Sequence, residues 1–127
     1  LLNRGIKSHY GYIEDFPNCV VLSDEVYDYL TFDGLDHIPF ASIGNNWNRT
    51  VTVYSGGKLL NATGWKVGWA IGPQSIIRLT GVINNTTIYC TNHPAQIAMA
   101  KALAVIDQEN HVKKQVDLFE EVRNYLH

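Results

Sequence analysis

Residues 54–69 read YSGGKLLNATGWKVGW and place two lysines, Lys58 and Lys66, among glycines, a serine and two tryptophans. The segments on either side, residues 50–54 (TVTVY) and 67–71 (VGWAI), are rich in the β-branched and aromatic residues typical of strands. A continuous apolar run at residues 18–23 (NCVVLS) predicts a further strand, and the helix-start signal Asp24-Glu25 follows it. The glycine-rich stretch therefore connects two of three predicted strands.

Helical spacing of apolar residues predicts helices at residues 25–30, 74–80, 94–106 and 109–127, and a weak helix in the first fifteen residues. Pro73 suits a first helical turn before residue 74, and residues 94–106 are rich in Ala and Leu. Continuous apolar strands interleaved with helices indicate an α/β fold whose sheet is covered on both faces.

Composition narrows the functional classes. The chain has 127 residues, 46% of them hydrophobic, and a net charge of −2, which fits one domain and suggests neither nucleic acid nor an anionic membrane as partner. No apolar run approaches the roughly 18 residues of a membrane span. Since no initiator Met or signal peptide opens the chain and a helical pattern ends it, we expect an internal piece of a longer intracellular protein, cytoplasmic or mitochondrial.

The cysteines and histidines do not indicate a metal site. Cys19 and Cys90 lie far apart among apolar or small neighbours, which predicts two buried thiols in a reducing compartment. The five histidines have no ligand spacing, so we expect them on the surface or in loops.

Polar residues follow two predicted strands, Ser23-Asp24 and Tyr54-Ser55, and α/β sheets bind ligands at such strand ends. Asp24 either caps the helix predicted at residues 25–30 or pairs with a cation. A lysine among small and apolar residues loses solvation and becomes nucleophilic enough to form a Schiff base, whereas a second lysine can pair with a phosphate. The alternative is that both lysines are exposed on a loop. The SGGK stretch lacks the Gly-x-x-x-x-Gly-Lys-Ser/Thr pattern of a nucleotide loop, so nucleotide binding is a minor alternative.

Three segments together resemble a known family. The order and spacing of residues 20–27 (VVLSDEVY), 55–58 (SGGK) and 63–69 (TGWKVGW) are similar to the large domain of fold-type I pyridoxal-phosphate aminotransferases. Within that superfamily, Gly-Trp-Lys and residues 85–90 (NTTIYC) resemble the kynurenine aminotransferase and cysteine-S-conjugate β-lyase branch. The resemblance implies that residues 1–127 are part of a three-layer α/β/α cofactor-binding domain with a mostly parallel sheet. The small domain and the N-terminal part of the enzyme lie outside these residues.

The resemblance also implies a role for each matching residue. Lys58 is the catalytic lysine, which forms a Schiff base with pyridoxal 5'-phosphate and later moves the substrate proton. Asp24 binds the pyridine nitrogen and Tyr27 the phenolic oxygen of the cofactor. Ser55 and Lys66 hold the phosphate through a hydroxyl and a charge.

The implied reaction is transfer of an amino group from an aromatic or sulfur-containing amino acid of the kynurenine type to a 2-oxo acid, in a homodimer. A β-lyase acting on cysteine conjugates with the same site, and a catalytically incompetent fragment, are the alternatives. An upstream Asn-Pro motif and a downstream carboxylate-binding Arg of the family are not found in the sequence. Arg49, Arg78 and Arg123 do not stand in a matching context.

Overall fold

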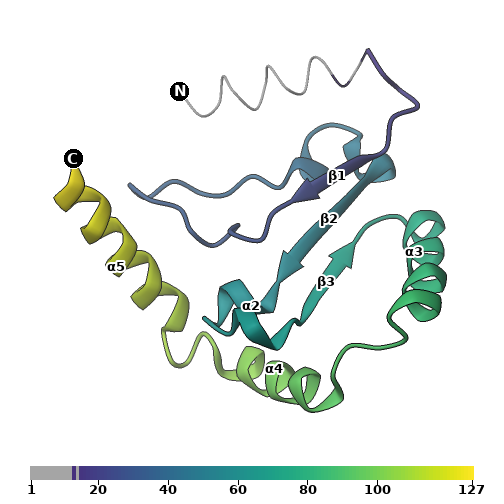
Figure 1. The fold of residues 1–127 in the computed structure, drawn as a ribbon. Coiled ribbons are helices and arrows are strands. Elements are labelled where there is room, and N and C mark those ends of the chain that lie inside the picture. Colours follow the sequence, from purple (N-terminus) through teal and green to yellow (C-terminus); the bar gives the residue numbers. More distant parts are fainter. Residues whose placement is uncertain (1–12, 14) are drawn as a thin grey trace.

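The computed structural model describes residue 13 and residues 15–127 (Figure 1). Three strands form one sheet: β1 (Val21–Asp24), β2 (Thr50–Ser55) and β3 (Gly68–Ile71). The helices are α2 (Gly56–Leu59), α3 (Gln74–Thr87), α4 (His93–Val105) and α5 (His111–Leu126), and single 3₁₀ turns are η1 (Phe40–Ser42), η2 (Asn46–Arg49) and η3 (Thr63–Trp65). No helix in this described part of the chain is both long and apolar enough to cross a membrane.

Strand β2 is central in the sheet and pairs differently with its two neighbours. It runs parallel to β1, with Asp24 opposite Val53, and antiparallel to β3, with Ser55 opposite Gly68. The connection from β2 to β3 contains only the single turns α2 and η3, so the chain reverses and returns beside the strand that it has left. The predicted α/β fold is confirmed, and the described sheet is mixed, with one parallel and one antiparallel pairing.

The three predicted strands and the three long helices are all present, and α3 extends beyond the predicted end to Thr87. The helix predicted at residues 25–30 is wrong, because this segment forms turns with the bonds Asp28 N–H to Glu25 O and Leu30 N–H to Tyr27 O. The reason lies in Glu25, whose buried carboxylate accepts hydrogen bonds from Ser23 and from the backbone of Phe40 and so draws the chain into a loop. The helix predicted in the first fifteen residues lies almost entirely outside the described residues.

The apolar core of the described residues is small. Its buried side chains are Val51 of β2 and Ala95 and Met99 of α4, and Met99 lies against the beginning of α2. A Cβ added to Gly56 would lie 2.5 Å from Met99 Sδ and 3.2 Å from the Trp69 ring, so a larger residue at this position would require these side chains to move. The Tyr54 and Trp69 rings stack across β2 and β3 with their centroids 6.0 Å apart.

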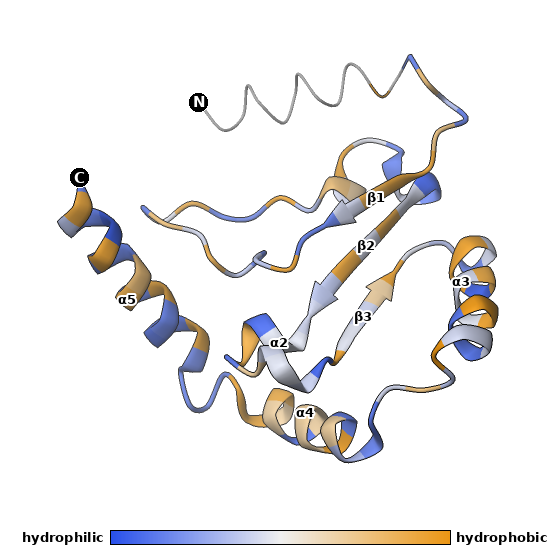
Figure 2. Ribbon diagram, viewed as in Figure 1, coloured by the Kyte–Doolittle hydropathy of each residue, from blue (hydrophilic) through white to orange (hydrophobic). Residues whose placement is uncertain are grey.

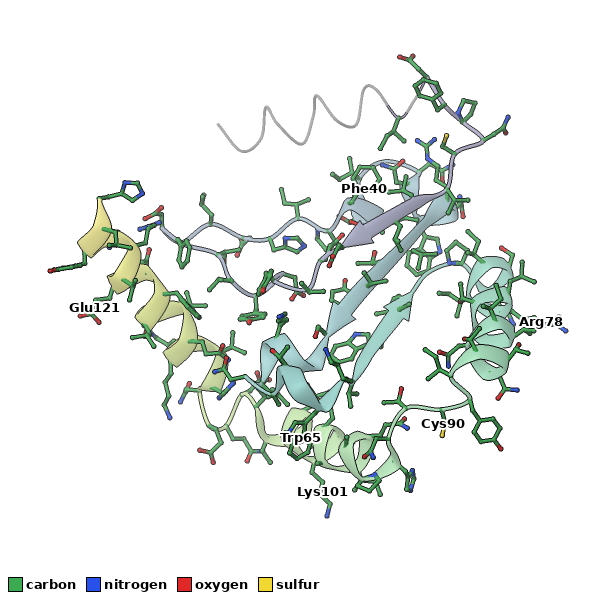
Figure 3. All side chains as sticks on the ribbon, viewed as in Figure 1. Phe40, Trp65, Arg78, Cys90, Lys101 and Glu121 are labelled. Atoms are coloured by element: carbon green, nitrogen blue, oxygen red, sulfur yellow. The ribbon has the colours of Figure 1, made fainter. Side chains whose placement is uncertain are left out.

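Much apolar surface remains outside this core. Figure 2 shows apolar residues along the strands and on α3, and Leu22 on the edge strand β1 is 72% exposed. Both cysteines are free and exposed, so the prediction of buried thiols is wrong. Cys90 lies in the connection between α3 and α4 (Figure 3), and its neighbours Ile88 and Tyr89 are exposed as well, so apolar flanks in the sequence did not lead to burial.

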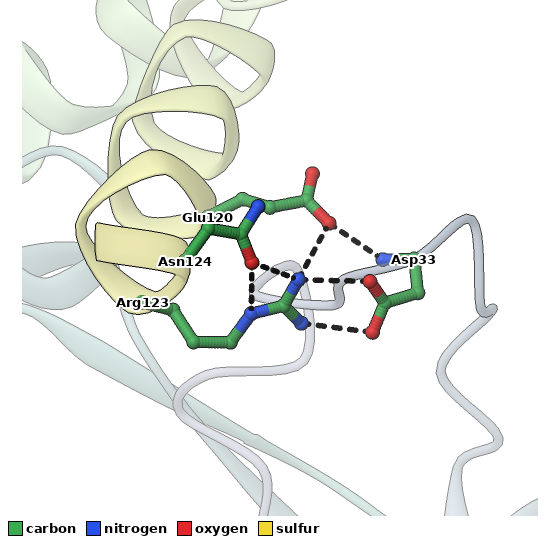
Figure 4. Close-up of polar contacts among 4 residues, drawn as sticks. All are labelled: Asp33, Glu120, Arg123 and Asn124. Carbon is green, nitrogen blue, oxygen red and sulfur yellow. Dashed lines mark hydrogen bonds and ion pairs between the residues drawn. The ribbon is translucent and has the colours of Figure 1, made fainter. Parts of the chain in front are cut away.

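One polar network joins the loop after β1 to α5 (Figure 4). The Arg123 guanidinium donates two hydrogen bonds of 2.8 Å to the Asp33 carboxylate, and Glu120 accepts one from the Asp33 backbone N–H. The guanidinium also lies 4.8 Å from the centroid of the Phe32 ring. Hydrogen bonding from Arg123 lowers the pKa of Asp33, and the carboxylate in turn raises the pKa of Arg123.

Replacing Gly57 by Ala tests the packing of the connection between β2 and β3. The new Cβ would lie 2.9 Å from Thr63 Cα and 3.1 Å from Ala62 O, both backbone atoms, so we expect a loss of about 1–3 kcal/mol in the free energy of unfolding. Gly64→Ala is the matched control, because its Cβ meets nothing within 4 Å. Urea unfolding of the purified variants measures both, and equal midpoints would contradict this packing.

The Asp33–Arg123 pair predicts a pH-dependent contribution to stability. Because the folded-state pKa of Asp33 lies below its ordinary value of 3.8, the contribution is fully present above that pH and is lost as pH falls through the folded-state pKa. Thermal unfolding of wild type and Asp33→Asn from pH 7 to pH 3 should show a gap in midpoint that is constant above pH 4 and narrows below it. A gap that does not change with pH, or that grows on acidification, would argue against the pair.

Candidate active site

Three chain segments meet at one edge of the sheet. Asp24 ends β1, Ser55 ends β2, and the antiparallel strand β3 begins at Gly68 directly opposite Ser55. Backbone bonds continue the pairing past the strand ends, from Glu25 N–H to Val53 O and from Gly56 N–H to Val67 O, each 3.1 Å long. The backbone positions of residues 24, 55 and 66 therefore lie near one another at this edge, although residue 24 is far from the other two in the sequence.

Lys58 is carried on α2, the single helical turn that follows β2. Ser55 begins this turn, and its Oγ accepts a hydrogen bond from the Lys58 N–H at 3.3 Å. The half-buried Lys58 side chain extends toward the loop after β1, where its Nζ lies 6.0 Å from the centroid of the Tyr27 ring. Within residues 13 and 15–127, no carboxylate forms an ion pair with this amine. Lys58 and Tyr27 are thus brought together, with the amine left available.

The Asp24 carboxylate is exposed at the end of β1. Its Oδ1 accepts a hydrogen bond of 3.4 Å from the Val26 N–H, which is a turn contact, and no helix follows for it to cap. The capping alternative for Asp24 therefore does not hold. Its carboxylate retains acceptor capacity for a hydrogen-bond donor outside the chain.

Lys66 lies at the end of η3, two residues before β3, and it is exposed. Its backbone is left-handed, with φ 55°, a conformation that costs a residue with a side chain about 1–2 kcal/mol. The chain therefore holds Lys66 in an unfavourable conformation beside the β2–β3 pairing. The Lys66 backbone therefore lies near Ser55, because the adjacent residue Val67 accepts a hydrogen bond from Gly56 N–H.

Several residues that support this edge had not been expected from the sequence. Glu25 is buried, and its Oε2 lies 2.7 Å from Nε2 of His37, which fixes the loop that carries Tyr27. The Tyr29 hydroxyl donates a hydrogen bond of 2.9 Å to the Lys58 carbonyl. Burial, followed by the neighbouring acidic groups, raises the pKa of Tyr29, and burial does the same for Tyr54.

Two of the arginines are already occupied by the fold. Arg49 donates to Asn46 Oδ1 and to the carbonyls of Ile13 and Phe16, and Arg123 binds Asp33. Arg78 extends away from the sheet on α3 (Figure 3). Among the residues that the structure describes, no group of three or more His, Cys, Asp or Glu side chains could hold a metal ion.

The edge offers a carboxylate, a phenol, a hydroxyl and two amines, and neither amine forms an ion pair with a carboxylate of the described residues. Such a set fits pyridoxal phosphate, whose aldehyde, protonated ring nitrogen and phosphate need an amine, a carboxylate and a hydroxyl with a cation. Chemically, the arrangement can bind such a molecule and hold a transferable proton on Lys58.

Comparison with known proteins gives consistent results. The family model for aminotransferase class I and II matches residues 13–127. The chain is 42% identical over 113 residues to kynurenine–oxoglutarate transaminase of Dictyostelium discoideum, covering 87% of this chain and 25% of that protein. It is 42% identical over 81 residues to human kynurenine–oxoglutarate transaminase 3, covering 64% of this chain and 18% of that protein. The chain thus spans a quarter or less of the length of these relatives.

Solved structures agree in fold. N-succinyldiaminopimelate aminotransferase from Mycobacterium tuberculosis superimposes with a TM-score of 0.78 at 37% identity, over 86% of this chain and 28% of that one. The aromatic aminotransferase from Pyrococcus horikoshii gives a TM-score of 0.85 at 25% identity, over 98% of this chain and 33% of that one. Since the family model covers nearly all of the chain, the protein belongs to the class I and II aminotransferases.

Proposed function

We propose that the protein transfers the amino group of an aromatic or sulfur-containing amino acid of the kynurenine type to a 2-oxo acid, with pyridoxal 5'-phosphate bound as a Schiff base to Lys58. The observation that carries the proposal is the meeting of Asp24, Ser55 and the Lys58 turn at one sheet edge, with the Lys58 amine beside Tyr27. The kynurenine–oxoglutarate transaminases among the relatives support the choice of substrate class.

When bound, pyridoxal phosphate supplies an electron sink that stabilises negative charge at the substrate Cα. Asp24 accepts a hydrogen bond from the protonated pyridine nitrogen and keeps that nitrogen charged by its own negative charge. Tyr27 donates a hydrogen bond to the phenolic oxygen. Ser55 and Lys66 bind the phosphate, Ser55 with its hydroxyl and Lys66 with its ammonium group.

Lys58 has two tasks. Its amine would hold the cofactor covalently as a Schiff base until the amino group of the substrate takes its place. The Lys58 amine would then act as a general base toward the proton on the substrate Cα and would return that proton as a general acid. Tyr29 and Ser55 hold the backbone on both sides of Lys58, which keeps the amine in one place during both tasks.

We also infer that residues 1–127 form part of the large domain of a longer enzyme that acts as a homodimer. The relatives, of whose length the chain spans only a quarter or less, support the inference of a longer enzyme, whereas the homodimer is what the family resemblance implies. Binding of the substrate carboxylate would then involve residues other than Arg49 and Arg123, because both already bind partners among the described residues.

Covalent labelling tests the site. After incubation with pyridoxal phosphate and reduction with borohydride, peptide mapping should find the label on Lys58. Lys58→Ala should abolish it, because the Lys58 amine is the one beside Tyr27 and the second amine at this edge, Lys66, is assigned to the phosphate. Lys101→Ala is the control, since Lys101 points away from the sheet on α4 (Figure 3) and should leave the label unchanged. A label elsewhere, or none in wild type, would refute the site.

The reaction is tested on the full-length protein with kynurenine and 2-oxoglutarate. We expect glutamate to form, and Lys58→Ala to lower kcat by about 10²–10⁴-fold because the proton then lacks its carrier. Lys101→Ala should again match wild type. Release of pyruvate and thiol from a cysteine conjugate, without amino-group transfer, would replace transamination by β-elimination.

A further inference from the structure

The carbonyl groups at the end of α2 have unusual partners. A single helical turn leaves its last carbonyls without helical N–H groups. Nearby backbone N–H groups bind the first two carbonyls of α2: Leu60 N–H donates to Gly56 O at 3.0 Å and Ala62 N–H donates to Gly57 O at 2.8 Å. The next two carbonyls, those of Lys58 and Leu59, are also bound by side chains from distant parts of the chain.

Gln115 of α5 binds the Leu59 carbonyl. Its Nε2 donates to Leu59 O at 2.8 Å and lies 2.7 Å from Nε2 of His111, one helical turn earlier. His111 Nε2 itself lies 3.1 Å from the Leu59 carbonyl oxygen, so two side chains of α5 contact this carbonyl, and Gln115 is only 6% exposed. Its Oε1 is buried with no hydrogen-bond partner among the described residues, so this orientation serves Leu59 at the expense of the other half of the amide.

Tyr29, which precedes α2 in the sequence whereas Gln115 follows it, binds the Lys58 carbonyl. Its hydroxyl donates a hydrogen bond of 2.9 Å to this carbonyl, which also accepts from the backbone N–H groups of Leu60 and, at 3.4 Å, of Asn61. Burial raises the pKa of Tyr29, so its hydroxyl keeps the proton that it donates. The carbonyls of Lys58 and Leu59 are thus both bound by side chains from outside the turn.

We propose that Gln115 and Tyr29 are positioning residues for Lys58. Gln115 holds the Leu59 carbonyl and Tyr29 the Lys58 carbonyl, and together they set the direction in which the Lys58 side chain projects from α2. Neither side chain needs to touch the cofactor. The proposal rests on the proposed function, because it concerns the reactivity of the lysine assigned there. It makes α5, at the far end of the chain, part of the support of the catalytic turn.

The experiment measures the rate at which Lys58 is trapped by pyridoxal phosphate and cyanoborohydride in the full-length protein, as a function of pH. Gln115→Leu keeps the size of the side chain and removes both amide hydrogens, and Tyr29→Phe removes only the hydroxyl. The matched control is Gln96→Leu, which removes a Gln–carbonyl bond of the same length, 2.8 Å, to Thr91 at an exposed site on α4. Urea unfolding of each variant gives its folded fraction under the conditions of trapping.

We expect Gln115→Leu and Tyr29→Phe each to slow trapping about tenfold per folded molecule and to shift its pH profile, because a misdirected amine meets the aldehyde less often. Gln96→Leu should match wild type. Wild-type rates and profiles in both variants, with Lys58 labelled throughout, would overturn the positioning role and leave the proposed function intact. Absence of label from wild-type Lys58 would overturn the proposed function and this role together. If Gln115→Leu does not fold, Tyr29→Phe alone decides.

Discussion

The pairing of β2 with a parallel strand on one side and an antiparallel strand on the other is the constraint on which the site depends. It puts the end of β1, the end of β2 and the beginning of β3 at one edge. Because side chains alternate between the faces of a sheet, a slip of one residue between β1 and β2 would turn Asp24 to the opposite face. Register, rather than proximity in sequence, therefore brings Asp24 to the end of the sheet at which the Lys58 turn begins.

Polar contacts hold the loops around this edge more than apolar packing does. The Glu25 carboxylate contacts the Ser23 hydroxyl, the His37 ring and the Phe40 backbone N–H. By contrast, the buried apolar side chains among the described residues are only Val51, Ala95 and Met99. A buried carboxylate with several donors fixes a loop firmly, because losing one donor leaves charge without compensation. The loop that carries Tyr27 is held in this way, and α5 is joined to the same loop through Arg123 and Asp33.

Local composition was sufficient to predict the strands and the long helices. β-branched runs marked β2, and Ala-rich or periodic apolar segments marked α4 and α5. The sequence wrongly predicted a helix at residues 25–30 because the deciding interaction, between Glu25 and Phe40, spans fifteen positions. It wrongly predicted that the two thiols are buried because apolar neighbours in the sequence do not ensure burial. The strand-end pattern and the family resemblance identified Asp24, Ser55 and Lys58 as candidates. Tyr29 and Gln115 gave no sequence signal, since their contacts with the Lys58 turn exist only once the chain is folded.

The most direct test of the account is a crystal structure of the full-length protein grown with pyridoxal phosphate. The account predicts continuous density from Lys58 Nζ to the cofactor, with the ring nitrogen at the Asp24 carboxylate, the phenolic oxygen at Tyr27 and the phosphate between Ser55 and Lys66. Cofactor bound to another lysine, or a ring nitrogen with no contact to Asp24, would contradict the claim that this sheet edge is the cofactor site.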